Sequence, residues 1–159
     1  MMNEIKFSEE SLKRFESIVG RYPKKEAAML PVLYLAQEEF GYLSPEAIEY
    51  VAAIMGVPVA RVYGVVTFYT MLNMKPIGRH HIQVCRTLPC ALAGAERITA
   101  AIKAKLGIGL GETTADGRFT LSEVECLASC GTAPMMQVND DYYESLSEQS
   151  VGEIFDRMK

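Results

Sequence analysis

Two pairs of cysteines constrain this chain more than any other sequence feature. Cys85 and Cys90 form a C-x4-C motif, and Cys126 and Cys130 form a C-x3-C motif. Each pair follows a segment that alternates like a β-strand, and strand ends place side chains at one edge of a sheet. Two loops that leave neighbouring strands can bring four sulfurs to one point. The pattern therefore predicts a soft metal centre bound by four thiolates.

The kind of centre stays open on spacing alone. Four-cysteine zinc sites are common, and their ligand spacing overlaps this one. Zinc knuckles, however, favour two residues between paired cysteines, whereas wider loops suit a larger centre. A [2Fe-2S] cluster held by Cys85, Cys90, Cys126 and Cys130 fits that description. Disulfides are disfavoured because cytosolic thiols are kept reduced. The spacing favours iron and sulfide, and a zinc scaffold that assembles partners remains the alternative from another functional class.

Composition and charge exclude several classes of function. The 159 residues carry a formal charge of -4, so the chain lacks the basic surface that binding to nucleic acid requires. The longest apolar run, residues 27–36, contains Pro31 and is too short to span a membrane. The N-terminal residues carry no signal or transit pattern. These features predict a cytoplasmic protein with no direct membrane insertion.

The first half of the chain, residues 1–74, predicts a bundle of four helices. Apolar residues recur at helical spacing between cap and stop signals. Ser8 and Ser44 are placed as N-caps, and Gly41 and Gly56 as stops. We expect the second helix to start near Pro23 and to be kinked at Pro31, and the fourth to open at Pro58.

The second half, residues 79–159, predicts the element order β-α-β-β-β-α, which makes the whole chain α+β. The expected elements are a strand at 80–84, a helix at 92–106, a strand with a bulge at 118–125, a hairpin at 134–143 and a final helix capped by Ser147. The Gly107–Gly111 segment, with alternate glycines, follows a helix rather than a strand, so it indicates a helix stop, not a nucleotide-binding loop. A linker at 73–78 would separate the halves.

His80 and His81 raise the question of a Rieske centre, in which two histidines replace two cysteines on one iron. Four cysteines already complete a ligand set. We therefore expect both histidines to lie at the start of a strand, facing solvent or covering the hinge.

Four segments carry a resemblance to a known family. They are CRTLPC at 85–90, ECLASCGTAP at 125–134, VNDDYY at 138–143 and VYGVVTFY at 62–69. Together they resemble the thioredoxin-like [2Fe-2S] ferredoxin family, and within it the [2Fe-2S] subunits of NADH-quinone oxidoreductase, the bacterial respiratory complex I. The resemblance covers nearly the whole chain. It implies a thioredoxin-like second domain and a [2Fe-2S] cluster on the four cysteines.

The resemblance also implies a function and partners. A subunit of this kind would exchange one electron at a time with FMN, while FMN and NADH bind to the neighbouring flavoprotein (F) subunit. An iron-sulfur (G) subunit would belong to the same peripheral arm on the cytoplasmic side of the membrane. The diaphorase subunits of NAD-linked hydrogenases and formate dehydrogenases are the alternative within the family.

Three positions near the cysteines need the structure to decide them. Ala128 stands where the family often has glycine, and a positive φ there would cost alanine about 1 kcal/mol or more; a helical loop would cost nothing. The fold suggests testing whether the Ala133-Pro134 bond is cis. Arg86 either tunes the centre through its charge or is a solvated loop residue.

Overall fold

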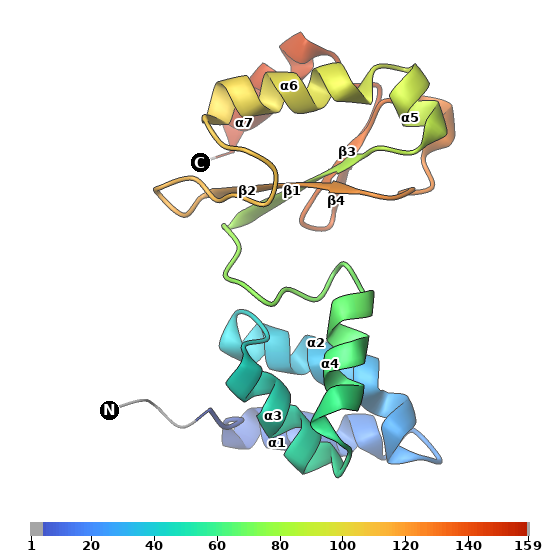
Figure 1. Ribbon diagram of the computed structural model, residues 1–159, viewed down its shortest axis with the longest axis vertical. Coiled ribbons are helices and arrows are strands. Elements are labelled where there is room, and N and C mark those ends of the chain that lie inside the picture. Colours follow the sequence, from blue (N-terminus) through green and yellow to red (C-terminus); the bar gives the residue numbers. More distant parts are fainter. Residues whose placement is uncertain (1–4, 159) are drawn as a thin grey trace. The chain divides into compact units, whose positions relative to one another are not determined.

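The computed structural model describes residues 5–158 and divides the chain into two units between Pro76 and Ile77 (Figure 1). This boundary falls inside the segment 73–78, where the change of periodicity led us to expect a linker. Each unit has its own hydrophobic core. The first unit is helical, whereas the second combines a four-stranded sheet with helices.

In the described part of the first unit, residues 5–76, there are four α-helices and one short 3-10 helix. In chain order they are α1 (Glu9–Val19), η1 (Lys25–Ala28), α2 (Met29–Phe40), α3 (Pro45–Met55) and α4 (Val59–Phe68). The predicted caps are confirmed, because the Ser8 hydroxyl accepts from the Ser11 N–H and the Ser44 hydroxyl accepts from the Ala47 N–H, each at 3.2 Å. Gly56 ends α3 in the left-handed conformation at φ 69°.

The expected course of the second helix is wrong at its start. The segment after Pro23 does not begin an α-helix; instead η1 turns into α2 at Met29. Pro31 therefore lies in the first turn of α2. Backbone N–H groups there have no intrahelical acceptor, so the missing N–H of proline costs the helix no hydrogen bond. Pro31 thus fits near the beginning of the helix and does not interrupt its middle.

The second unit follows the predicted order of strands and long helices, but a short helix at Leu88–Leu92 was not predicted, and the helix expected at 92–106 begins only at Ala95. Its elements are β1 (His80–Cys85), α5 (Leu88–Leu92), α6 (Ala95–Leu106), β2 (Phe119–Val124), η2 (Cys130–Thr132), β3 (Met136–Val138), β4 (Asp141–Tyr143) and α7 (Glu148–Arg157). The strands lie in the order β2-β1-β3-β4. β1 and β2 are parallel, and the other neighbours are antiparallel.

The bulge expected in β2 is absent. β1 and β2 pair residue for residue, from His80 opposite Phe119 to Cys85 opposite Val124. Val124 is buried although its parity differs from that of Phe119 and Leu121. Successive side chains of a regular strand point to opposite faces of the sheet. Phe119 and Leu121 are therefore buried on one face, and Val124 is buried on the opposite face at the end of the strand.

Helices α6 and α7 pack against each other and cover one face of the sheet (Figure 1). The predicted cap of α7 is confirmed as a capping box between Ser147 and Ser150. Gly107 ends α6 at φ 68°, so the glycine-rich segment is the expected helix stop. The helices thereby fix β1 from one side, and the end of β1 carries the first cysteine.

Candidate metal centre

The two cysteine loops start at the same edge of the sheet. β1 ends at Cys85 and its parallel neighbour β2 ends at Val124, two residues before Cys126. The Arg86 N–H donates to the Val124 carbonyl at 3.0 Å, which holds the two chain segments together one step beyond the strands. Because the carboxyl ends of parallel strands meet at one edge, this topology brings both predicted pairs to the same region.

The first pair is part of the hydrophobic core. Cys85 and Cys90 are 2% and 1% exposed. Cys85 is the last residue of β1, and Cys90 lies in the short helix α5. Thr87 is the N-cap residue of α5, and Pro89 lies in its first turn. A regular strand and a helix thus place both sulfurs.

Hydrogen bonds favour the thiolate form of Cys85. Its sulfur lies 3.3 Å from the Thr87 hydroxyl. Burial opposes ionisation, yet hydrogen bonds from the Thr87 side chain and from the backbone N–H groups of Leu127 and Thr87 outweigh it and lower the pKa of Cys85. The Leu127 N–H comes from the second cysteine loop, so the two loops already meet at this sulfur.

The second pair lies on an exposed loop. Cys126 and Cys130 are exposed, and their sulfurs are 3.9 Å apart. The N–H of Ala128 donates to the Cys126 sulfur at 3.3 Å. Ala128 has φ 62°, so it occupies the left-handed region that costs an alanine about 1 kcal/mol. The helical alternative for this loop is therefore wrong.

The charges of the four thiols act on one another across the two loops. Burial, followed by the neighbouring Cys85, raises the pKa of Cys90 to about 11, and the charge of Cys130 contributes. A hydrogen bond with Cys126 and its charge raise the pKa of Cys130. Such mutual repulsion opposes the presence of four thiolates without a cation, and it disappears when a metal centre supplies positive charge.

The donor set fits an iron-sulfur cluster. All four cysteines are free thiols. The Cys126 and Cys130 sulfurs lie 3.9 Å apart, and the Cys85 and Cys90 side chains are hydrogen-bonded to each other. The backbone N–H groups of Ala128 and Leu127 donate to cysteine sulfurs, and such hydrogen bonds stabilise the negative charge that thiolate ligands of a cluster carry.

Two residues that the sequence interpretation did not single out hold the exposed loop. The Tyr142 hydroxyl donates to the Leu127 carbonyl at 2.9 Å. The Glu144 carboxylate accepts from the Thr132 hydroxyl at 2.6 Å and also from the Ser129 hydroxyl. Both belong to β4 or follow it directly. The VNDDYY segment contributed to the resemblance, but no local pattern linked it to the cysteines.

Arg86 has a specific partner. Its Nε and Nη2 atoms both donate to one carboxylate oxygen of Glu125, at 3.0 and 2.6 Å. The side chains are 60% and 68% exposed. Arg86 follows Cys85, and Glu125 precedes Cys126, so the ion pair bridges the two loops and balances the positive charge of Arg86.

The two histidines lie at the other end of β1. Both are at the start of a strand, as expected, and both are half-buried rather than fully exposed to solvent. The His80 ring stacks on Phe119 with ring centres 5.2 Å apart, and His81 Nε2 lies 2.9 Å from the Ser122 hydroxyl. Burial lowers the pKa of His81. Five residues of extended strand, roughly 16 Å, separate His80 from Cys85.

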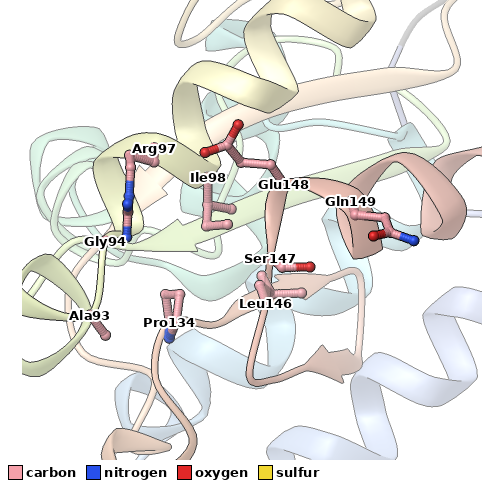
Figure 2. Close-up of a pocket in the computed structure, with 9 residues that line it drawn as sticks. All are labelled: Ala93, Gly94, Arg97, Ile98, Pro134, Leu146, Ser147, Glu148 and Gln149. Atoms are coloured by element: carbon pink, nitrogen blue, oxygen red, sulfur yellow. The ribbon is translucent and has the colours of Figure 1, made fainter.

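A cavity of about 390 Å³ lies between α6 and the beginning of α7 (Figure 2). Pro134 forms part of its wall, and the Ala133-Pro134 bond is cis. Its remaining lining residues are Ala93, Gly94, Arg97, Ile98, Leu146, Ser147, Glu148 and Gln149. No cysteine contributes to this cavity.

Comparison with known proteins gives concordant results. The family described as thioredoxin-like [2Fe-2S] ferredoxin matches residues 15–159. The E subunit of NADH-quinone oxidoreductase from Rickettsia conorii is 48% identical over 156 residues, which cover 96% of this chain and 93% of that protein. The mitochondrial NADH dehydrogenase [ubiquinone] flavoprotein 2 of Dictyostelium discoideum is 45% identical over 96% of this chain and 63% of its own length.

Among solved structures, an NAD+-reducing [NiFe]-hydrogenase in the air-oxidised state superimposes with a TM-score of 0.71 at 19% identity. The match covers 82% of this chain but only 22% of the hydrogenase chain, so it bears on the fold alone. Within residues 5–158, no helix is long and apolar enough to cross a membrane.

Proposed function

Because the chain belongs to the thioredoxin-like [2Fe-2S] ferredoxin family, we propose that it is the one-electron-transfer subunit of the NADH dehydrogenase module of a respiratory complex I. One observation carries this proposal: two pairs of free thiols follow the carboxyl ends of two parallel strands, in a chain 48% identical to a subunit of NADH-quinone oxidoreductase. In such a module the cluster, when bound, accepts and returns single electrons.

The cluster ligands in this proposal are Cys85, Cys90, Cys126 and Cys130. The buried pair excludes water from one side of the site, while the exposed pair leaves the other side open to a partner. Hydrogen bonds from N–H groups to the sulfurs stabilise the reduced cluster, which carries more negative charge, so they raise the reduction potential of the cluster. Thr87, Leu127 and Ala128 supply such groups.

The proposed partners rest on the resemblance to NADH-quinone oxidoreductase subunits, and redox chemistry is consistent with them. NADH gives up a hydride, whereas an iron-sulfur cluster takes one electron, so a flavin must connect them. The sequence contains no nucleotide or flavin motif. By the resemblance to the subunits of NADH-quinone oxidoreductase, FMN and NADH would bind to the flavoprotein (F) subunit, and the iron-sulfur (G) subunit would complete the same arm on the cytoplasmic side of the membrane. A cluster held by the four cysteines would accept an electron transiently from reduced flavin or would stabilise the assembled arm.

Exposed apolar side chains support docking to other subunits. Leu88 and Leu92 are 70% and 81% exposed and lie one helical turn apart on α5, the helix that carries Cys90. In the first unit, whose helices we propose to form a four-helix bundle, Tyr63 and Phe68 of α4 are also exposed. Large exposed apolar residues beside a functional site indicate a surface that a partner covers.

Metal analysis tests the proposed centre. The chain is purified anaerobically, assayed for iron, sulfide and zinc, and examined by EPR after reduction with dithionite. We expect two irons and two sulfides for each chain, and a spin-half signal. One zinc for each chain, with no signal even after reconstitution with iron and sulfide, would support the zinc scaffold and overturn the proposal.

Replacement of one ligand tests the role in the complex. Cys126→Ala removes an exposed sulfur, so it should abolish the cluster with little effect on the fold. We expect the assembled module to lose NADH oxidation rate, stability or both relative to the wild type. Unchanged assembly and unchanged NADH oxidation in the cluster-free variant would contradict both suggested roles.

A further inference from the structure

The planar peptide between Leu127 and Ala128 connects the exposed loop to β4. Its carbonyl oxygen accepts the Tyr142 hydroxyl at 2.9 Å, and its N–H donates to the Cys126 sulfur at 3.3 Å. In a trans peptide the C=O and N–H point in opposite directions. A hydrogen bond that fixes the oxygen therefore also fixes the direction of the hydrogen.

This peptide has no regular secondary structure to orient it. Ala128 is in the left-handed region at φ 62°, and the surrounding loop lies between β2 and η2. A peptide held in a sparsely populated conformation persists only where neighbouring groups determine it. Tyr142 is such a group, because β4 is anchored in the sheet through its pairing with β3.

We propose that Tyr142 is a positioning residue for the metal centre: its hydroxyl holds the Leu127-Ala128 peptide so that the Ala128 N–H is directed at Cys126, which sets the reduction potential of the cluster. This inference rests on the proposed function, since it requires a cluster on these cysteines. A hydrogen bond to the carbonyl also polarises the peptide and strengthens its N–H as a donor. Tyr142 acts through the peptide and touches no sulfur.

Tyr142→Phe removes the hydroxyl and keeps the ring. Tyr143→Phe is the matched control, because Tyr143 is the next residue of β4 and its ring packs against the core on the opposite face of the strand. Both full-length variants are loaded with iron and sulfide, and their metal content is compared with that of the wild type. Redox titration followed by EPR then gives the midpoint potential.

We expect Tyr142→Phe to have a more negative midpoint potential. At the wild-type midpoint, its ratio of oxidised to reduced cluster should rise about threefold, the effect of weakening one hydrogen bond. Pulsed EPR of the reduced cluster with ¹⁵N-labelled alanine should show a weaker coupling to the Ala128 amide nitrogen. Tyr143→Phe should match the wild type in both measurements. A role confined to stability would leave the potential and the coupling unchanged.

A fluorinated side chain supplies the opposite perturbation. Site-specific 3-fluorotyrosine at position 142 has a more acidic hydroxyl and is a stronger donor, so it should move the potential in the positive direction. If Tyr142→Phe fails to load a cluster, this shift decides the question: a positive shift supports the proposal, and an unmoved potential overturns it.

The outcomes separate the two proposals. A wild-type chain that carries the cluster, with a Tyr142→Phe variant equal to it in potential and in coupling, overturns the positioning role and leaves the proposed function intact. A wild-type chain that cannot carry a [2Fe-2S] cluster overturns the proposed function itself.

Discussion

The two cysteine pairs reach the same edge of the sheet by different structural means. Cys85 and Cys90 belong to a strand and a helix and are buried in the core of the second unit. Cys126 and Cys130 lie on an exposed loop that side chains from β4 and its following turn hold in place. The first pair is positioned by the forces that fold the unit, whereas the second is positioned by a few local hydrogen bonds.

This difference assigns different tasks to the two loops. Burial of the first pair contributes to the stability of the unit and keeps solvent from one side of the site. The second loop includes a residue at positive φ and contributes little buried surface, so its conformation costs free energy that Glu144 and Tyr142 offset. We therefore expect replacements in the first loop to change folding and replacements in the second to change the centre.

The largest predicted effect is the loss of the cluster, which we expect in both Cys90→Ala and Cys130→Ala, because each removes one of four proposed ligands. Cys90→Ala also leaves a cavity in the core, so its free energy of unfolding should lie roughly 1 kcal/mol below that of Cys130→Ala. Chemical denaturation of the two cluster-free chains measures this difference. Equal stabilities would remove the distinction between a core pair and a loop pair.

Much of the fold was predictable because it follows from short-range patterns. The caps at Ser8, Ser44 and Ser147 and the stop at Gly107 depend on residues within one turn, and all are present in the structure. The start of α2 was not predictable in the same way. Pro23 is a start signal, but residues 24–26 are charged and the apolar stripe begins only at Met29, so the chain forms a 3-10 turn at Lys25–Ala28 before the α-helix.

The candidate site was predictable only in part, for a similar reason. Paired cysteines after two strands indicated where the sulfurs meet. The groups that hold the second loop come from β4, and Tyr142 lies 15 positions from Leu127 in the chain, so no local spacing reveals the contact. Ala128 was suspected from the family pattern, but its positive φ became visible only in the folded loop.

A second comparison places the same substitution in two settings. Ala128→Gly should raise the free energy of unfolding by up to about 1 kcal/mol, because glycine adopts positive φ without strain. Ala104→Gly, at an exposed position inside α6, should lower it by about 1 kcal/mol. Urea denaturation of both variants measures the sign. Destabilisation by both would mean that the loop is not strained at Ala128.

A third prediction concerns the carboxylate that holds the exposed loop. Glu144→Ala removes the acceptor of two hydroxyl groups, so the loop should open more often, at a cost of about 0.5–1 kcal/mol. Glu144→Gln keeps an acceptor oxygen and should stay close to the wild type. Hydrogen exchange of the amides in residues 126–132 reports the difference. If the amides of Glu144→Ala exchanged as slowly as those of Glu144→Gln and the wild type, Glu144 would not hold the loop.

The smallest predicted effect tests whether the charges of Arg86 and Glu125 shift the midpoint potential of the cluster. Removal of a positive charge disfavours the reduced state, so Arg86→Gln should lower the midpoint potential, and Glu125→Gln should raise it by a similar amount. Each shift should be on the order of tens of millivolts or less, because both side chains are exposed and dissolved salt screens them. The double variant restores the net charge and should lie near the wild type.

Redox titrations at low and high salt measure these shifts. Shifts of the same sign in both single variants would show that the pair acts by holding the loops together, because an effect of charge must reverse its sign with the charge removed.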